Sequence, residues 1–162
     1  MPSPDGAAAG ILLGMDTDSL ALEHLSPEEC VQLMGSVPVG RIVYTRQALP
    51  AVELVNFALV DGDIVIRTNA EGKLAAATRG AVVAFEADTV DLEGHVGWSV
   101  AIVGQARAVS DGEEIRALER VALKSWVPGT AGGHFIRISP TIVNGRRVGG
   151  PQPTGGRDAH RQ

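Results

Sequence analysis

The chain has 162 residues, which is enough for one domain with a hydrophobic core and too few for two comfortable ones. Its net charge of −5 argues against a nucleic-acid binder, and no apolar run approaches the ~20 residues that a membrane span needs. The single cysteine, Cys30, and the acidic residues around the short apolar segment 11–15 predict a cytoplasmic protein without a signal peptide.

The composition changes along the chain and predicts one domain between two tails. Residues 1–24 begin with a stretch rich in Ala, Gly, Asp and Pro, and residues 149–162 are rich in Gly and Pro with almost no apolar side chain. Such segments cannot bury enough apolar surface to order themselves. We therefore expect a mobile N-terminal segment, a domain over 25–148 and a disordered C-terminal tail.

The first expected element is a short helix in the segment LSPEECVQLMG. Ser26 is a suitable N-cap, Pro27 fits the first helical position, and Glu29 completes a capping box. Gly35 is a natural end for this helix.

Beyond this helix the apolar residues follow a two-residue period, which is typical of half-buried strands. Asp61 and Gly62 suit a tight two-residue hairpin, and Gly104 suits a bend within a long strand. The six expected strands cover residues 41–45, 51–60, 63–68, 81–90, 97–109 and 134–142.

Two further short helices are expected between these strands. One lies in GKLAAATRG, where Gly80 can end it, and the other in SDGEEIRALERVALKS, where Ser110 or Asp111 can cap it. A parallel α/β sheet would need a helix after nearly every strand. The order of elements therefore predicts a mainly β protein, a six-stranded antiparallel barrel with peripheral short helices.

Several kinds of site find no support in the sequence. The P-loop pattern fails because Arg67 stands where a glycine is needed and Leu74 where Ser or Thr is needed. There is no G-x-S-x-G elbow, and the carboxylates are scattered. The histidines lack the spacing of a metal site; they are His24, His95, His134 and His160. If the protein is an enzyme, we expect a cofactor to carry its chemistry.

Arg67, Thr68 and Lys73 lie together where an expected strand ends and a helix begins. Lysine occurs otherwise only at Lys124, and a lysine in the first turn of a helix opposes the macrodipole. An anion at this junction would explain the residues, and a phosphate is the natural candidate. Ordinary surface polarity is the alternative, with Arg67 paired to Glu53 or Glu71 in a surface ion pair.

The ordered segments GRIVYT, P-x-V-x-L-V-N-F (50–57), IRTNAEGKL, GWSVAIVGQA and IRISPTIVNGRR resemble a known family. It is the pyridoxamine 5′-phosphate oxidase-like family of FMN-binding split β-barrels, and the likeness to its small bacterial members covers roughly residues 25–148. The resemblance implies an oxidoreductase acting on an unidentified small molecule. It also implies a homodimer with flavin mononucleotide (FMN) at the subunit interface.

The resemblance also implies which residues hold the cofactor. By similarity, Thr68 and Lys73 hold the FMN phosphate, helped by Arg67. The other residues that it places at the cofactor are Arg41 beside the phosphate, Leu74 next to Lys73, Val55, Asn56 and Phe57 along the isoalloxazine ring, Trp98 and Ser99 near the ring or the ribityl chain, and Trp126 and Arg147 from the partner subunit.

Structural interpretations stay open for several of these residues. Core packing would also explain Val55 and Phe57, and Trp98 could close the barrel. Arg147 could belong to a solvated hairpin end that follows Asn144 and Gly145.

Other functions on the same barrel stay open too. The likeness stops before the C-terminal substrate segment of true pyridoxamine phosphate oxidases, so vitamin B6 oxidation does not follow from it. A deazaflavin-dependent reductase would need basic residues such as Arg79, Arg146 and Arg147 at the groove exit. A non-enzymatic flavin or heme protein is the third alternative, with His95 or His134 as the heme ligand.

Overall fold

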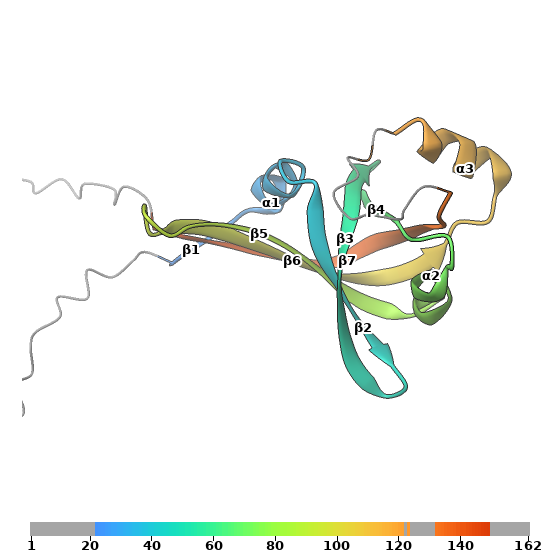
Figure 1. Ribbon diagram of the computed structural model, residues 1–162. Coiled ribbons are helices and arrows are strands. Elements are labelled where there is room, and N and C mark those ends of the chain that lie inside the picture. The colour runs from blue at the N-terminus through green and yellow to red at the C-terminus, as the bar shows by residue number, and fades with distance from the viewer. Residues whose placement is uncertain (1–21, 122, 124–131, 150–162) are drawn as a thin grey trace, which may run out of the picture.

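Seven antiparallel strands form one sheet in a computed structural model that describes residues 22–121, 123 and 132–149 (Figure 1). The strand order is β1-β7-β4-β3-β2-β5-β6, and β7 pairs with β6 as well, which closes the sheet into a barrel. The elements are β1 (Leu22–His24), α1 (Pro27–Met34), β2 (Val39–Arg46), β3 (Leu49–Val60), β4 (Asp63–Arg67), α2 (Lys73–Thr78), β5 (Val82–Asp91), β6 (Val96–Ala108), α3 (Gly112–Glu119) and β7 (Phe135–Val148).

The mainly β architecture and the six expected strands are confirmed within one or two residues at most ends. Two arms leave the barrel in different directions: the β2–β3 hairpin is one, and β5, β6 and the C-terminal half of β7 form the other (Figure 1). The helices lie at the periphery, with α2 and α3 near one end of the barrel and α1 at the base of the longer arm.

The structure adds a strand that the sequence did not predict. Leu22–His24, which we assigned to the N-terminal segment, pair with Arg146–Val148 at the edge of β7. They do so because β7 runs to Val148, well beyond residue 142, and offers its edge to another strand. Residues 1–21 and 150–162, the rest of the two expected tails, lie outside the described residues.

Asn144 and Gly145 do not lead into a hairpin end, so that alternative interpretation of Arg147 is wrong. Both residues lie inside β7, where they pair with Ala101 and Val100 of β6. Gly145 serves close packing instead, since a Cβ there would lie 2.4 Å from the Cys30 sulfur on α1. Arg146 and Arg147 are therefore strand residues, and Cys30 is a buried free thiol.

Local signals at the other turns and caps are confirmed. Ser26 and Glu29 form the capping box of α1. Asp111 caps α3, with Glu114 donating its backbone N–H to the Asp111 carboxylate at 2.8 Å. Asp61 and Gly62 have φ of 53° and 83°, the left-handed pair that a two-residue hairpin requires.

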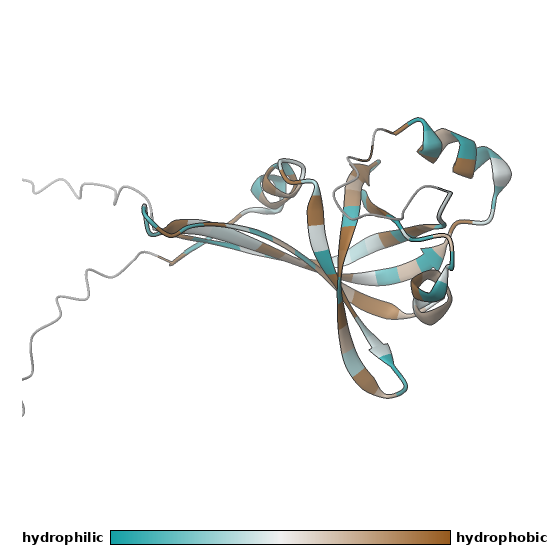
Figure 2. Cartoon of the chain, viewed as in Figure 1, coloured by the Kyte–Doolittle hydropathy of each residue, from teal (hydrophilic) through white to brown (hydrophobic). Residues whose placement is uncertain are grey.

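The core lies inside the barrel, and burial alternates along β2, β5 and much of β6, whereas three successive residues of β4 are buried. Figure 2 shows hydrophobic and hydrophilic residues interspersed along the strands. Phe57 and Phe85 meet edge to face there, with ring centroids 4.8 Å apart. A smaller cluster of Val65, Leu118 and Phe135 seats α3 on the outside of β4 and β7. The two clusters hold α3 and the barrel in one unit.

Arg137 of β7 ties α3 to the sheet through a partly buried ion network. Its Nε lies 2.6 Å from an Asp63 carboxylate oxygen, and its Nη1 lies 3.0 Å from Glu114 Oε1. Arg107 also binds Glu114, at 2.6 Å. The Arg137 side chain is 14% exposed, so removing it would leave Asp63 without this cation and Glu114 with Arg107 alone, at a site that is largely closed to water.

We predict that Arg137→Gln lowers the free energy of unfolding by about 2–3 kcal/mol, because Asp63 and Glu114 lose their shared cation. Urea denaturation measures this loss. Arg116→Gln removes a cation from the same helix region without touching the network and is the matched control. Equal urea midpoints for the two variants would contradict the structural role of Arg137.

Candidate functional site

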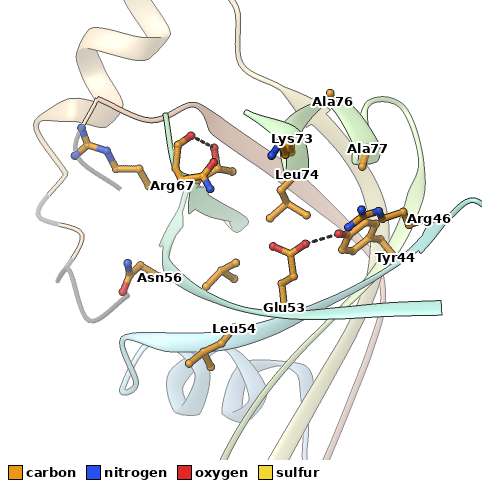
Figure 3. A pocket seen from close by; sticks show the side chains of 13 residues that line it. Tyr44, Arg46, Glu53, Leu54, Asn56, Arg67, Lys73, Leu74, Ala76 and Ala77 are labelled. Carbon is orange, nitrogen blue, oxygen red and sulfur yellow. Dashed lines mark hydrogen bonds between the residues drawn. The ribbon is translucent and has the colours of Figure 1, made fainter. Parts of the chain in front are cut away.

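A pocket of about 450 Å³ lies between α2, the β2–β3 hairpin and the end of β4 (Figure 3). This volume is within the usual range for small-molecule sites. We call it the α2 pocket. Its lining residues are Tyr44, Arg46, Glu53, Leu54, Val55, Asn56, Arg67, Thr68, Asn69, Lys73, Leu74, Ala76 and Ala77.

One side of the pocket, the lysine end, contains Thr68, Asn69 and Lys73. Thr68 is 4% exposed, and its hydroxyl donates to the Asn69 carbonyl at 3.1 Å. The Thr68 backbone N–H donates to the His134 carbonyl at 2.8 Å. A Cβ at Gly133 would lie 1.6 Å from the Thr68 carbonyl oxygen. Only glycine therefore allows the backbone just before β7 to pack against the backbone that follows β4. The backbone therefore holds the Thr68 hydroxyl in place.

Lys73 is the first residue of α2, and its ammonium lies 2.7 Å from the Glu71 carboxylate. The two side chains are 82% and 62% exposed, and such a surface pair contributes little to stability. An anionic ligand can therefore replace Glu71 at low cost. The helix has only six residues, so the ammonium rather than a helix dipole would attract that ligand.

Arg67 lines the pocket but does not point at Lys73. Its side chain extends away from Lys73 (Figure 3), and its guanidinium carbon lies 5.4 Å from the centroid of the Phe135 ring. The buried Arg67 Nε has no hydrogen-bond partner among the described residues. The alternative pairing with Glu53 or Glu71 is not what the structure shows, because Glu53 binds Tyr44 and Glu71 binds Lys73.

The opposite side of the pocket, the carboxylate end, consists of Tyr44, Arg46 and Glu53. The Tyr44 hydroxyl donates to Glu53 Oε1 in a short hydrogen bond. Burial raises the pKa of Tyr44, and the bond to Glu53 raises it further, while Arg46 opposes the rise. Leu74 lies between the two ends of the pocket (Figure 3).

Sequence reasoning missed the carboxylate end. The available signal was that Tyr44 is the single tyrosine and falls on the inward face of its strand together with Ile42. Glu53 pairs with Ile42 in the β2–β3 register, which brings it diagonally next to Tyr44. That register could not be read from the sequence alone.

The α2 pocket gathers six of the twelve predicted site residues: Val55, Asn56, Arg67, Thr68, Lys73 and Leu74. Phe57 instead packs against Phe85 in the core, as the core-packing interpretation proposed. Val55 is 5% exposed and serves both the core and the pocket wall. Trp126 lies outside the described residues.

Three of the remaining predicted residues lie on the longer arm: Trp98, Ser99 and Arg147. Trp98 and Ser99 line a second hollow of about 490 Å³, which we call the arm hollow, together with His95 and Arg146. Arg147 faces Trp98 across β6 and β7, and its Nη1 lies 3.0 Å from Glu23.

Arg41 lies on the outer face of β2, where it binds two carboxylates, and it does not line the α2 pocket. Its Nη1 lies 3.0 Å from Glu86 and 2.9 Å from Asp88. Within one chain, the residues that the resemblance assigned to a single cofactor therefore fall in separate regions.

The described part of the chain contains no cluster of three or more residues able to bind a metal. Within the same residues, none of the helices is long and apolar enough to cross a membrane. His134, one of the two histidines considered for heme, packs its ring against Gly72 beside the lysine end.

Residues 26–147 match the family described as pyridoxamine 5′-phosphate oxidase. Over 130 residues the chain is 41% identical to Uncharacterized protein Rv0080 of Mycobacterium tuberculosis. These aligned residues cover 77% of this chain and 84% of that protein. The fold is similar to that of the FAD binding protein from Mycobacterium smegmatis, with a TM-score of 0.65 and 35% identity over 77% of this chain and 97% of that one. A conserved protein of unknown function from Corynebacterium diphtheriae gives a TM-score of 0.65 and 30% identity, over 78% and 98% of the two chains.

The buried phenol of Tyr44 predicts an alkaline titration. We expect its pKa to lie above the ordinary value of 10.0, chiefly because of burial and then because of the bond to Glu53. Because the pKa of Tyr44 is raised in the folded state, its neutral phenol stabilises the folded chain at pH values below ~10. This contribution to the free energy of unfolding is lost as the pH rises through the pKa of the folded state.

Tyrosinate absorbance reports this group alone, because the chain has one tyrosine. Glu53→Gln should lower the pKa while leaving it above the ordinary value, since burial remains. A titration that coincides with that of the urea-unfolded chain would contradict the buried phenol.

Proposed function

Since this chain belongs to the pyridoxamine 5′-phosphate oxidase family, we propose that it is a flavin-binding oxidoreductase that holds FMN in the α2 pocket. The observation that carries the proposal is the convergence of Thr68, Lys73, Val55 and Leu74 on one pocket. The first two residues suit a phosphate, and the last two suit an aromatic ring. Vitamin B6 need not be the substrate.

The charge of the pocket favours an anionic ligand. Arg46, Arg67 and Lys73 line it together with Glu53, and Glu71 pairs with Lys73, so three cations and two carboxylates leave a net charge of +1. The whole chain carries −5, which makes this positive region a local feature. The phosphate of a flavin would accept hydrogen bonds from the Lys73 ammonium and the Thr68 hydroxyl, and both would be charge-assisted because the phosphate is ionised.

The residues present also fit the rest of the cofactor. Val55, Leu74 and Ala77 provide an apolar wall for the isoalloxazine ring, and the lining also includes Arg67, whose buried Nε has no partner among the described residues. A bound flavin supplies hydride or electron transfer to a small substrate. The chain itself binds and orients that group and excludes water, and no side chain is needed as a dedicated acid or base.

The likeness to the Mycobacterium smegmatis FAD binding protein makes the longer flavin the main alternative. A deazaflavin coenzyme is less well supported than a flavin. Its acidic tail would need basic residues at the exit of the pocket, but Arg146 lines the arm hollow and Arg147 binds Glu23. His95, which we considered as a heme ligand, lines the arm hollow and does not line the α2 pocket.

We further propose that a second copy of the chain covers the outer face of the sheet. The residues Val52, Val43, Ala84, Val103 and Ile142 are successive cross-strand neighbours on that face. Val52 is 60% exposed and Ile142 50%, and a continuous apolar row of this kind marks an interaction surface. A homodimer through this face would allow Trp98 and Ser99 of the partner to complete the flavin site.

We predict that the purified protein is yellow and that Lys73→Ala weakens FMN binding about tenfold, the value of one charge-assisted hydrogen bond. Riboflavin lacks the phosphate, so its affinity should not change. Fluorescence quenching gives both affinities, and Arg116→Ala, which removes a cation from α3, is the matched control. Unchanged FMN affinity in the lysine variant would remove the phosphate assignment, and a Soret band would favour heme.

The dimer proposal predicts that Val52→Asp and Ile142→Asp dissociate the protein into monomers, because each buries a charge in the proposed interface. Sedimentation equilibrium measures the mass directly. Arg116→Asp, a charge change on the exposed side of α3, should leave the dimer intact. If the unmodified chain is already a monomer, the proposed interface is wrong.

A further inference from the structure

The phosphate assignment leaves the carboxylate end of the α2 pocket unexplained. An anionic ligand bound at Lys73 gains nothing from a carboxylate in the same pocket, because like charges repel. Glu53 nevertheless lines the pocket, and it is fixed there by Tyr44. The pocket therefore has the Lys73 ammonium, paired with Glu71, at one end and the Glu53 carboxylate, with Arg46 near it, at the other.

Tyr44 makes Glu53 a well-positioned acceptor. The phenol is 5% exposed and sits in the barrel core, so its hydroxyl cannot follow a moving partner. An ionised carboxylate offers about four lone-pair sites, of which the Tyr44 hydroxyl takes one. The others can accept hydrogen bonds from a ligand, and the side chain points into the pocket toward Leu74 (Figure 3).

The charges around Glu53 restrict the donors that it can receive. A cationic ligand would be repelled by Arg46 and Lys73, which line the same pocket. A second phosphate would be repelled by Glu53 itself. Neutral hydroxyl groups satisfy the carboxylate without either cost, and a carboxylate bound to the hydroxyls of a ribose is a recurrent arrangement in nucleotide sites.

We propose that Glu53, positioned by Tyr44, accepts hydrogen bonds from the sugar-type hydroxyl groups of the cofactor whose phosphate binds at Lys73. The inference rests on the proposed flavin-binding function. In a flavin these hydroxyls have two sources, the ribityl chain that every natural flavin carries and the ribose of the adenylate in FAD. The two sources have the same chemistry and are separated by experiment.

Four ligands test the assignment on the full chain: lumiflavin, which has no ribityl chain, riboflavin, FMN and FAD. We expect Glu53→Ala to reduce one preference about tenfold, either that for riboflavin over lumiflavin or that for FAD over FMN. The first result identifies ribityl hydroxyls and the second the adenylate ribose. Tyr44→Phe, which keeps the aromatic packing, should reduce the same preference by a smaller factor because Glu53 loses its anchor.

Two controls separate a loss of hydroxyl recognition from other effects. Glu113→Ala removes a carboxylate from α3, away from the pocket, and should change neither preference. Urea midpoints show whether each variant is folded. If Glu53→Ala fails to fold, Tyr44→Phe and Glu53→Gln carry the test.

The possible failures are distinguishable. If the flavins bind but both preferences survive in every Glu53 and Tyr44 variant, the role of Glu53 is overturned and flavin binding stands. If the unmodified chain binds none of the four ligands, the proposed function fails and the role of Glu53 fails with it.

Discussion

Closure of the sheet by β7 is the constraint on which the rest of this structure depends. One strand of 14 residues pairs with β4, β6 and β1, so it joins the barrel, the longer arm and the N-terminal edge. The closure requires a bend in β6 at Gly104, where the register with β7 shifts and a Cβ would lie 2.1 Å from the Ser139 carbonyl oxygen. Because β7 begins at Phe135, the same strand also brings the 133–134 backbone against Thr68 and so fixes the floor of the pocket.

The pocket inherits its polarity from the elements that surround it. The β2–β3 hairpin supplies Tyr44 and Glu53 from adjacent strands, and the turn after β4 supplies Thr68 and Lys73. Tyr44 and Thr68 are buried and held by their hydrogen bonds, and only the exposed Lys73 has to leave Glu71 when an anionic ligand binds. A ligand with an anionic end and a hydroxylated part would therefore meet groups that are already in position, which lowers the entropic cost of binding.

Local patterns were sufficient for much of the fold. The capping box at Ser26, the Asp61–Gly62 turn and the alternation of apolar residues gave the helices and six strands, because each depends on neighbours in sequence. The rarity of lysine drew attention to Lys73, which lines the pocket, and its role toward an anion stays a prediction. Tertiary contacts were not accessible in this way. The pairing of Tyr44 with Glu53 depends on strand register, and the direction of Arg67 depends on Phe135, which is distant in the chain.

The close packing of Gly133 limits how the sequence of this protein can change during evolution. The Gly133 backbone touches the Thr68 carbonyl so closely that any side chain would push apart the two segments that hold the Thr68 hydroxyl. Its neighbour Gly132 has open space around it, although its φ of +70° also disfavours other residues. A mutational scan would thus find intolerance at a position that carries no functional group. Sequence drift there is limited by the geometry of two backbones, and the pocket can change its ligand only through residues elsewhere on its walls.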